Sequence, residues 1–372
     1  IGEVYNIDLT VPIFEIEQPN YFVSIISEKW LHCKARTPIM LNSMILPSKF
    51  PQSTLINDDN ALVKASDLLV DEFKDAFSFE TFNKFQSDAF DAVYNTERNV
   101  LFNTSKGNGK TTIGELALLN HWKNEKGRAV FISPIQEQVD LLTKKWKKRF
   151  SGLAGGKVIS KLTGELNVDL KLLAKSHLIL CTVDQFDLLS RRWKQRKNIQ
   201  SIELLIADDI HEVGDGKLGA IYENVISRMR YIQVNLEKEI RFVVLGSSLA
   251  SFKDFADWLD VPKHSIFNFD SRERVFPVEV QFQKFDINHV PSLVKCCIRP
   301  AYDSINAMNE INGEEKAIVF VPTRKQCIEV YMEFVKKLKG DGKQWLRTEK
   351  SSLEPYLKKI KDQNLIEMIN HG

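Results

Sequence analysis

The sequence predicts an α/β fold in which a parallel β-sheet is covered by helices on both faces. Short apolar runs of strand length recur between residues 99 and 246, and segments with helical spacing lie between them. Strands that are apolar throughout are typical of a parallel sheet with both faces buried. The five runs are N-V-L-F-N, R-A-V-F-I-S, H-L-I-L-C-T, E-L-L-I-A-D and R-F-V-V-L-G.

Helical segments are predicted in the same order along the chain. Two precede the first strand, at 65–73 and 82–94, and two follow the first and second strands, at 112–122 and 135–146. Strand and helix therefore alternate, as the connections of a parallel sheet require.

The length of 372 residues predicts more than one domain. Residues 1–76 are rich in proline and alternate weakly, which predicts a β-rich extension of short strands and extended chain. Residues 77–277 hold the α/β pattern. Residues 278–372 open a second βα pattern, with a strand at 316–322 (K-A-I-V-F-V-P) and a helix at 323–334, and are expected to form part of a second domain.

The composition is that of a soluble globular protein, with 43% hydrophobic and 27% charged residues. A net charge of +2 gives no overall basic field, so nucleic acid would have to be bound by local patches. The five cysteines are odd in number and form no Cys-x-x-Cys pair, which favours a reduced, intracellular protein without a zinc site. No apolar run approaches a membrane span. The first residue is Ile1 and no domain ends clearly before Gly372, which indicates an excerpt of something longer.

The segment T-S-K-G-N-G-K-T-T, residues 104–112, resembles a phosphate-binding loop between a strand and a helix. Its glycines let backbone N–H groups turn toward an anion, and the helix N-terminus adds partial positive charge. Lys110 would reach the β and γ phosphates, and the Thr111 hydroxyl would touch Mg²⁺. A plain glycine-rich turn is the alternative. The candidate nucleotide-binding residues of the loop are Thr104, Gly107, Asn108, Gly109, Lys110, Thr111 and Thr112.

The segment D-D-I-H, residues 208–211, follows the apolar run E-L-L-I-A. A carboxylate at the carboxyl end of a buried strand faces the ligand crevice of an open α/β sheet, so Asp208 is the candidate for holding Mg²⁺ through water. Asp209 stands where a longer acid would orient the attacking water, and His211 is a further catalytic candidate. A solvated acidic loop is the alternative.

Two basic segments contain a tryptophan, T-K-K-W-K-K-R-F (143–150) and S-R-R-W-K-Q-R-K (190–197). They could follow a phosphate backbone and stack on bases. The favoured interpretation is that Trp146 and Trp193 face the core of amphipathic segments while the charges are solvated.

Taken in order, these motifs resemble a superfamily-two DExH-box helicase, and most closely the tandem-cassette RNA helicases of the spliceosome (the Brr-two type). The resemblance extends over nearly the whole chain. It implies a RecA-like first domain and the opening of a second. The segments that carry it are F-N-K-F-Q (82–86), the loop at 104–111, A-V-F-I-S-P (129–134), L-T-G-E (162–165), C-T-V-D-Q-F-D (181–187), D-D-I-H (208–211), L-G-S-S-L-A-S (245–251) and I-V-F-V-P-T-R (318–324).

The resemblance implies roles for individual residues. Gln86 would contact adenine, and Lys110 and Thr111 keep their phosphate and Mg²⁺ roles, so the implied cofactors are ATP and Mg²⁺. His211 would couple the nucleotide to the next motif. RNA contacts are implied for Arg324, Thr163 and Thr182.

The departures from the family pattern fall on catalytic positions. The family loop reads Ala-Pro-Thr-Gly-Ser-Gly-Lys-Thr, and the family acid pair is Asp-Glu. A Ser-Thr-Pro-like motif becomes C-T-V at 181–183, and a Ser-Ala-Thr-like motif becomes G-S-S at 246–248. In the loop the replacements are Thr104, Ser105, Lys106 and Asn108.

The leader at 12–31 (P-I-F-E-I-E-Q-P-N-Y-F-V-S-I-I-S-E-K-W-L) resembles the N-terminal extension of the family's second, C-terminal cassette. With the departures, the resemblance implies a C-terminal, degenerate helicase cassette that binds ATP and serves as regulator and protein-interaction platform. The parent protein would unwind paired small nuclear RNAs (U-four/U-six) in the nucleus through its other cassette. The implied partners are that cassette, spliceosomal proteins and RNA. The alternatives are an active ATP-driven RNA translocase, which would need an arginine finger from a complete second domain, a DNA-repair helicase, and a P-loop kinase, which the second βα pattern disfavours.

Overall fold

The computed structural model divides into two compact units, Ile1–Val278 and Glu279–Gly372. The domain boundaries 77–277 and 278–372 stay a prediction. The structure describes residues 7, 20–30, 32–40, 62–74, 76–153, 155–247, 249, 251–270, 273–276, 278, 285–287, 289–312, 316–343, 345–346, 348–360 and 362–371.

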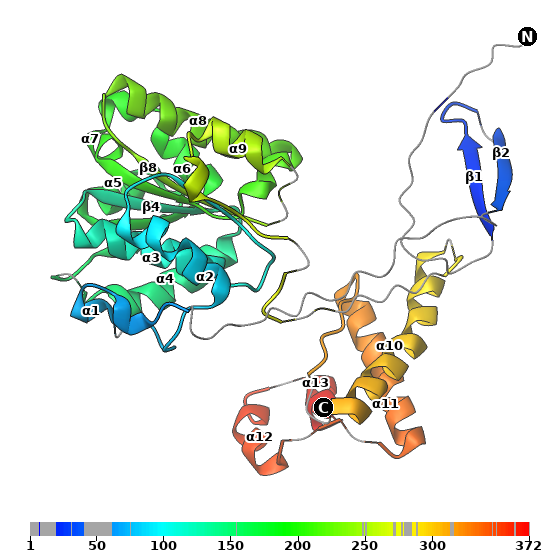
Figure 1. Cartoon of the computed structure of the whole chain (residues 1–372). Helices are drawn as coiled ribbons and strands as arrows, with labels where there is room; N and C mark the ends of the chain where they lie inside the picture. Colours follow the sequence, from blue (N-terminus) through cyan, green and yellow to red (C-terminus); the bar gives the residue numbers. More distant parts are fainter. Residues whose placement is uncertain are drawn as a thin grey trace, which may run out of the picture. The chain divides into compact units, whose positions relative to one another are not determined.

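The first unit is built on a seven-stranded sheet in which every pairing is parallel (Figure 1). The strand order is β5-β6-β4-β7-β8-β3-β9. This confirms the predicted fold class, a RecA-like parallel sheet. The strands are β3 (Val100–Asn103), β4 (Arg128–Ser133), β5 (Ile159–Lys161), β6 (Leu178–Thr182), β7 (Ile202–Ala207), β8 (Arg241–Gly246) and β9 (Ile266–Asn268).

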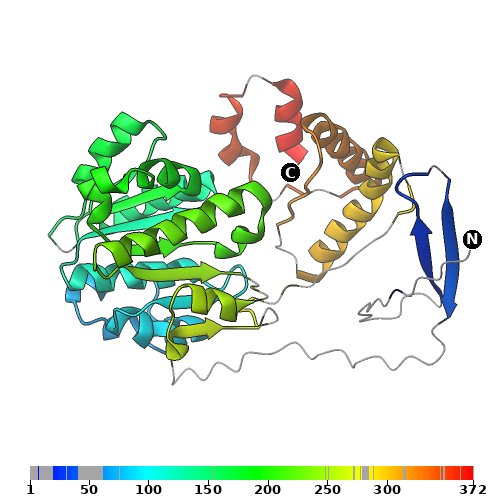
Figure 2. The same ribbon diagram turned by 90° about the horizontal axis from the view of Figure 1, so that it is seen from above.

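Helices cover both faces of this sheet (Figures 1 and 2). Successive residues of a strand point to opposite faces, so Val100 and Phe102 join one apolar cluster and Leu101 joins the other. The first face packs against α2 (Lys84–Phe90), α3 (Lys110–Lys123) and α4 (Gln136–Phe150). The second packs against α5 (Leu166–Lys175), α6 (Val183–Ser190), α8 (Gly216–Asn235) and α9 (Phe252–Trp258).

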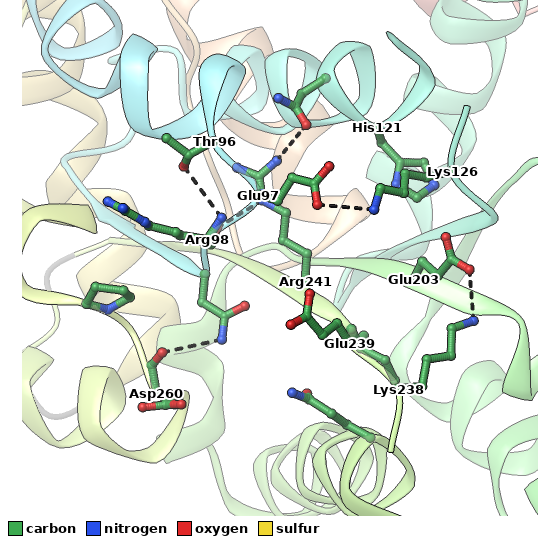
Figure 3. Close-up of a pocket in the computed structure, with 15 residues that line it drawn as sticks. Thr96, Glu97, Arg98, His121, Lys126, Glu203, Lys238, Glu239, Arg241 and Asp260 are labelled. Carbon is green, nitrogen blue, oxygen red and sulfur yellow. Dashed lines mark hydrogen bonds and ion pairs between the residues drawn. The ribbon is translucent and has the colours of Figure 1, made fainter. Parts of the chain in front are cut away.

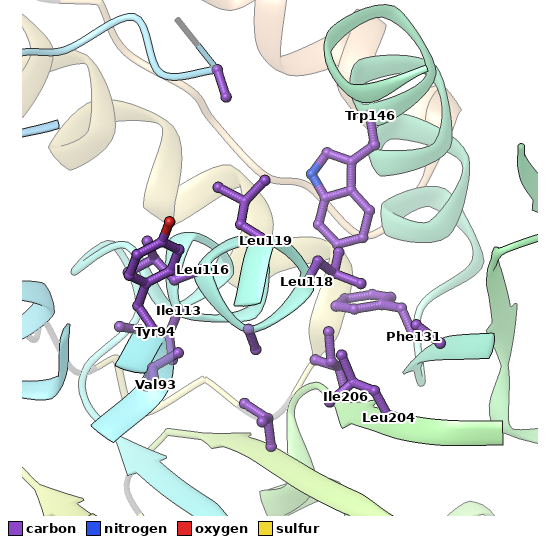
Figure 4. Packing of buried hydrophobic residues seen from close by; sticks show 14 of the residues in the cluster. Val93, Tyr94, Ile113, Leu116, Leu118, Leu119, Phe131, Trp146, Leu204 and Ile206 are labelled. Atoms are coloured by element: carbon purple, nitrogen blue, oxygen red, sulfur yellow. The ribbon is translucent and has the colours of Figure 1, made fainter. Parts of the chain in front are cut away.

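Helix α3 forms the centre of the first cluster (Figure 4). It is buried around most of its circumference, and Leu116, Leu118 and Leu119 are all fully covered. A charged group lies in this apolar setting, because Glu115 accepts a hydrogen bond of 2.8 Å from the indole of Trp146 and pairs with Arg149. The rigid packing of α3 fixes the position of the loop that precedes it.

The five predicted strands are all present, and two further strands were missed. Strands β5 and β9 have three residues each and include polar positions, so neither forms an apolar run. The predicted helix at 65–73 is wrong in extent, because only a 3-10 turn, Ala65–Asp67, and the short α1, Asp71–Lys74, form there. The other short elements are the π-helical turn Asp91–Asn95, η4 (Trp193–Gln195), α7 (Lys197–Gln200), η5 (Ile210–Gly214) and η6 (Lys263–Ser265).

The described part of the N-terminal extension contains an antiparallel pair, β1 (Asn20–Ile26) and β2 (Lys34–Met40). Asn20 pairs with Met40 and Ile26 with Lys34. This agrees with the prediction of short strands. Residues 41–61 of the extension lie outside the described residues.

The second unit is helical in its described residues. Its apolar cluster includes Tyr302, Phe334 and Leu338. The strand predicted at 316–322 is wrong for this structure, since 316–321 form no strand and Phe320 is 90% exposed. A strand needs a hydrogen-bonded neighbour, and the described residues supply none there. The helices are α10 (Val290–Asn312), α11 (Arg324–Asp341), α12 (Lys350–Leu357) and α13 (Gln363–His371). None of the helices described is long and apolar enough for a membrane span.

Replacement of Glu115 by alanine tests the buried group beneath α3. We expect the free energy of unfolding, measured in urea, to fall by about 3 kcal/mol, because Arg149 and the Trp146 indole both lose a partner. Glu115→Gln, which keeps an acceptor for the indole, should lose clearly less. Equal losses in the two variants would contradict a contribution from the charge.

Candidate functional site

The candidate site lies at the carboxyl edge of the sheet, where neighbouring strands end. Strands β7, β8 and β3 are adjacent in the sheet. The segments that follow them are D-D-I-H, the residues from Ser247 on, and the loop at 104–109. Because the carboxyl ends of parallel strands share one edge, three stretches far apart in the sequence meet there.

The predicted phosphate loop changes direction at two glycines. Gly107 has φ 96° and Gly109 has φ 84°, a region that favours glycine. A Cβ on Gly109 would also overlap Nε2 of Gln86. That Nε2 donates to the Gly109 carbonyl at 3.2 Å, and Asn83 Nδ2 donates to the Asn108 carbonyl at 3.0 Å. The start of α2 therefore holds the loop in place, while an adenine contact of Gln86 stays a prediction.

Lys110 connects the loop to the acidic turn. Its Nζ lies 3.1 Å from Oδ1 of Asp209 and also bonds the hydroxyl of Ser247. The side chains of Lys110 and Asp209 are each only 10% exposed, so their charges attract each other with little screening by solvent. The structure thus brings together the predicted phosphate lysine and the second acid of D-D-I-H.

Asp208 is buried at the end of β7 with both carboxylate oxygens engaged. Oδ2 accepts from Gln138 Nε2 at 2.7 Å, and Oδ1 accepts from the Asp209 amide at 3.0 Å. The Tyr222 hydroxyl donates to the Asp208 carbonyl at 2.7 Å. Burial, and then the negative charge of Asp209, raises the pKa of Asp208 to about 6. Gln138, which bonds the carboxylate, and Tyr222, which bonds the main-chain carbonyl, were both missed, since the sequence carries no signal that either residue contacts Asp208.

His211 links the acidic turn to the segment after β8. Its Nδ1 accepts a hydrogen bond of 3.3 Å from the Ser247 amide and lies 4.0 Å from Oδ1 of Asp209. Burial lowers the pKa of His211, which favours the neutral ring, and the Ser247 amide donor selects the tautomer whose Nδ1 carries no proton. Asp209 itself adopts φ 49°, a conformation that Asp tolerates better than most residues. Ser248 lies outside the described residues.

The donor set suits Mg²⁺ bound together with a phosphate. Asp208 offers a carboxylate, and Thr111 offers a hydroxyl in the first turn of α3, where Thr112 donates to the Gly109 carbonyl at 3.1 Å. The described residues hold no cluster of three or more His, Cys, Asp or Glu that could bind an ion. Mg²⁺ is commonly held by one or two protein oxygens plus phosphates and water, so the residues fit this ion.

Two of the predicted RNA contacts, Thr163 and Thr182, lie at other strands of the same sheet. Thr163 follows β5, and its amide and hydroxyl both bond Asp169, at 2.7 and 2.8 Å. Thr182 ends β6 and caps α6. Both threonines are at the carboxyl edge, toward the β5 end of the strand order. Arg324 begins α11 in the second unit and is exposed.

The two basic segments place their tryptophans in the first unit's core. Trp146 is fully buried in α4 and Trp193 is 9% exposed, which confirms the core interpretation. Stacking of a base on Trp146 is therefore excluded. In the second segment Arg196 donates to the Leu189 carbonyl and closes the end of α6.

A cavity of about 620 Å³ lies at the opposite, amino-terminal edge of the sheet (Figure 3). Its charged groups largely satisfy one another. Lys126 pairs with Glu97 at 3.1 Å and Lys238 with Glu203 at 3.0 Å. Arg241 donates to main-chain carbonyls, among them that of Arg98 at 2.9 Å. Most of the charged groups that line the cavity are therefore paired, and the cavity lies at the edge of the sheet opposite the loop at 104–109.

Residues 83–255 match the family model of the DEAD/DEAH box helicases and form a DEAD/DEAH box helicase domain. This confirms the class that the motifs indicated. The chain is 39% identical to the pre-mRNA-splicing factor brr2 of Schizosaccharomyces pombe, over 98% of this chain and 17% of that protein. It is 36% identical to the U5 small nuclear ribonucleoprotein 200 kDa helicase of Homo sapiens, over 97% of this chain and 17% of that protein.

The chain thus spans 17% of the length of these curated relatives. Among solved structures, the helicase Lhr of Mycobacterium smegmatis, determined with single-stranded DNA and AMP-PNP, is similar with a TM-score of 0.51. The match covers 76% of this chain and 37% of that one at 17% identity, and it supports the fold alone.

His121, which lines the cavity at the amino-terminal edge, makes stability depend on pH. Burial lowers the pKa of His121 from 6.5 to about 4, and Nε2 bonds the Gly127 carbonyl at 2.8 Å. Because the pKa of His121 is lower in the folded protein than in the unfolded chain, the unfolded chain binds the proton first as the pH falls. Stability is then complete above pH 6.5 and declines toward pH 4, by about 3 kcal/mol in all.

We expect His121→Gln, which can still donate to that carbonyl, to reduce the loss of stability between pH 7 and 4.5. Urea unfolding of both proteins at several pH values measures this. Parallel pH profiles for the two proteins would contradict the assignment.

Proposed function

We propose that this chain is a nucleotide-binding helicase cassette whose hydrolytic activity is lost or very weak. It would hold ATP with Mg²⁺ through the loop at 104–112, with Lys110 on the phosphates and Thr111 and Asp208 as the protein's Mg²⁺ ligands. Bound Mg²⁺ would neutralise phosphate charge. In the larger protein the cassette would act as regulator and docking platform.

The observation that carries the proposal is the ion pair that holds the Asp209 carboxylate. Its carboxylate is held by Lys110 at 3.1 Å, inside a network that includes Ser247. An aspartate is one methylene shorter than the glutamate of the family pattern, so its carboxylate cannot reach as far from the same backbone. Because a displacement of about 1 Å can lower a rate about a hundredfold, binding can survive where hydrolysis does not.

Nucleotide binding needs less of the site than hydrolysis does. The structure contains the turns at Gly107 and Gly109, and α3 begins directly after them at Lys110. These are the groups that recognise phosphates by charge and by backbone N–H groups. The His211–Ser247 contact also offers a path by which nucleotide could affect the segment after β8.

The names of the relatives support a role in splicing. On that basis we propose a nuclear RNA helicase as parent protein, which unwinds paired small nuclear RNAs (U-four/U-six), with spliceosomal proteins, RNA and a second cassette as partners. The second candidate is an active RNA translocase in which Asp209 serves as base. A DNA-repair helicase is the third, and the choice of RNA over DNA depends on the relatives.

Calorimetric titration with ATP and Mg²⁺ tests the binding step. We expect the chain to bind, and Lys110→Ala to weaken binding by at least about tenfold because the phosphates lose a cation. Asn224→Ser, an exposed change on α8, is the matched control and should bind as the unchanged protein does. The absence of any binding would contradict the proposal and leave only the shape of a phosphate loop.

Phosphate release in the full-length protein tests the reaction. The phosphate-loop lysine of any other cassette is replaced, so that only this site can turn over ATP. We expect no stimulation by single-stranded RNA, and an increase of about tenfold or more in Asp209→Glu, because the longer acid restores the reach. RNA-stimulated release in the unchanged cassette would favour the active translocase.

A further inference from the structure

Asn108 lies inside the predicted phosphate loop, and its side chain bonds three protein groups, two of them in residues 273–275. Nδ2 donates to the Glu273 carbonyl at 2.9 Å, and Oδ1 accepts from the Val275 amide at 3.1 Å. The second Nδ2 hydrogen goes to the Thr104 hydroxyl at 2.9 Å. Asn108 is 1% exposed, so these bonds form away from water.

The partner of Asn108 is the connecting segment, residues 273–276, which leads to the boundary between the two units at Val278. The segment is not held by burial, because Val275 is 39% and Phe276 73% exposed. Hydrogen bonds hold it instead, including one of 3.4 Å from Arg274 to the Lys106 carbonyl. Its position therefore depends on the loop at 104–109 as well as on the Asp270 carbonyl, which accepts from the Glu273 amide at 2.9 Å.

Two residues of this arrangement differ from the family loop. Where the family has alanine, Thr104 supplies the hydroxyl that orients the Asn108 amide. Where the family has serine, Asn108 supplies a donor and an acceptor on one planar group. Serine carries only one oxygen on a shorter stem, so it could not bond the Glu273 carbonyl and the Val275 amide in the same way.

We infer that Asn108 is a clasp that fastens the connecting segment to the phosphate loop, so that nucleotide in the loop controls the segment that leads to the second unit. The clasp uses side-chain atoms of Asn108 and Thr104 and the main-chain carbonyl of Lys106. It uses none of the backbone N–H groups of the loop. Nucleotide can therefore bind while the clasp is closed. By ordering the loop, it also orders residues 273–276. This coupling depends on the proposed nucleotide binding, whereas the clasp itself does not.

Hydrogen exchange of the Val275 amide tests the clasp without nucleotide, because this amide is the donor to Asn108. We expect Asn108→Ser to raise its exchange rate about tenfold, as the loss of one or two hydrogen bonds implies. Serine occurs at this position in the family loop, so the variant should fold. Asn224→Ser is the control and should leave the rate unchanged. An unchanged rate in Asn108→Ser would overturn the clasp.

The same measurement with saturating ATP and Mg²⁺ tests the coupling. Exchange of the Val275 amide should slow at least threefold in the unchanged protein and respond less in Asn108→Ser. Calorimetry on the same samples reports binding independently. Binding without any change in exchange overturns the coupling. Absence of binding overturns the proposed function and the coupling with it, while the nucleotide-free comparison still decides whether the clasp exists.

Discussion

The ion pair between Lys110 and Asp209 is the contact on which the arrangement of the site depends. It joins the loop after β3 to the turn after β7, and the Ser247 hydroxyl adds the segment after β8. The Lys110 ammonium carries three N–H donors, and Asp209 and Ser247 are its two hydrogen-bond partners here. A phosphate bound to Lys110 would therefore change the balance of charge around Asp209, and His211 Nδ1 lies 4.0 Å from that carboxylate.

The sequence predicted the sheet and the glycine-rich loop between β3 and α3 because both have local signals, while phosphate binding by that loop stays a prediction. Apolar runs of strand length mark the five strands of the sheet's centre, and Gly107, Gly109 and Lys110 mark the loop. Strands β5 and β9 are too short for a periodic pattern. Gln138 and Tyr222 escaped prediction for a different reason, since only the folding of α4 and α8 onto the sheet brings them to Asp208.

In the second unit, an apolar run with the composition of a strand does not form a strand. Residues 316–322 have the composition of a buried strand, but composition specifies a preference and not a partner. Without a neighbouring strand among the described residues, Ile318 and Phe320 stay exposed. The helix predicted at 323–334 formed as α11, because a helix satisfies its own backbone and depends less on distant segments.

The hydrogen bond between Thr104 and Asn108 has an evolutionary consequence. Each residue is useful through the other, because the threonine hydroxyl orients the amide that reaches residues 273–275. A lineage that changed only one of the two residues would lack the hydrogen bond between them. Positions 104 and 108 should therefore covary among homologues, with Thr and Asn inherited together and Ala and Ser together. The history of this loop would then include the acquisition of a new contact between two segments of the first unit.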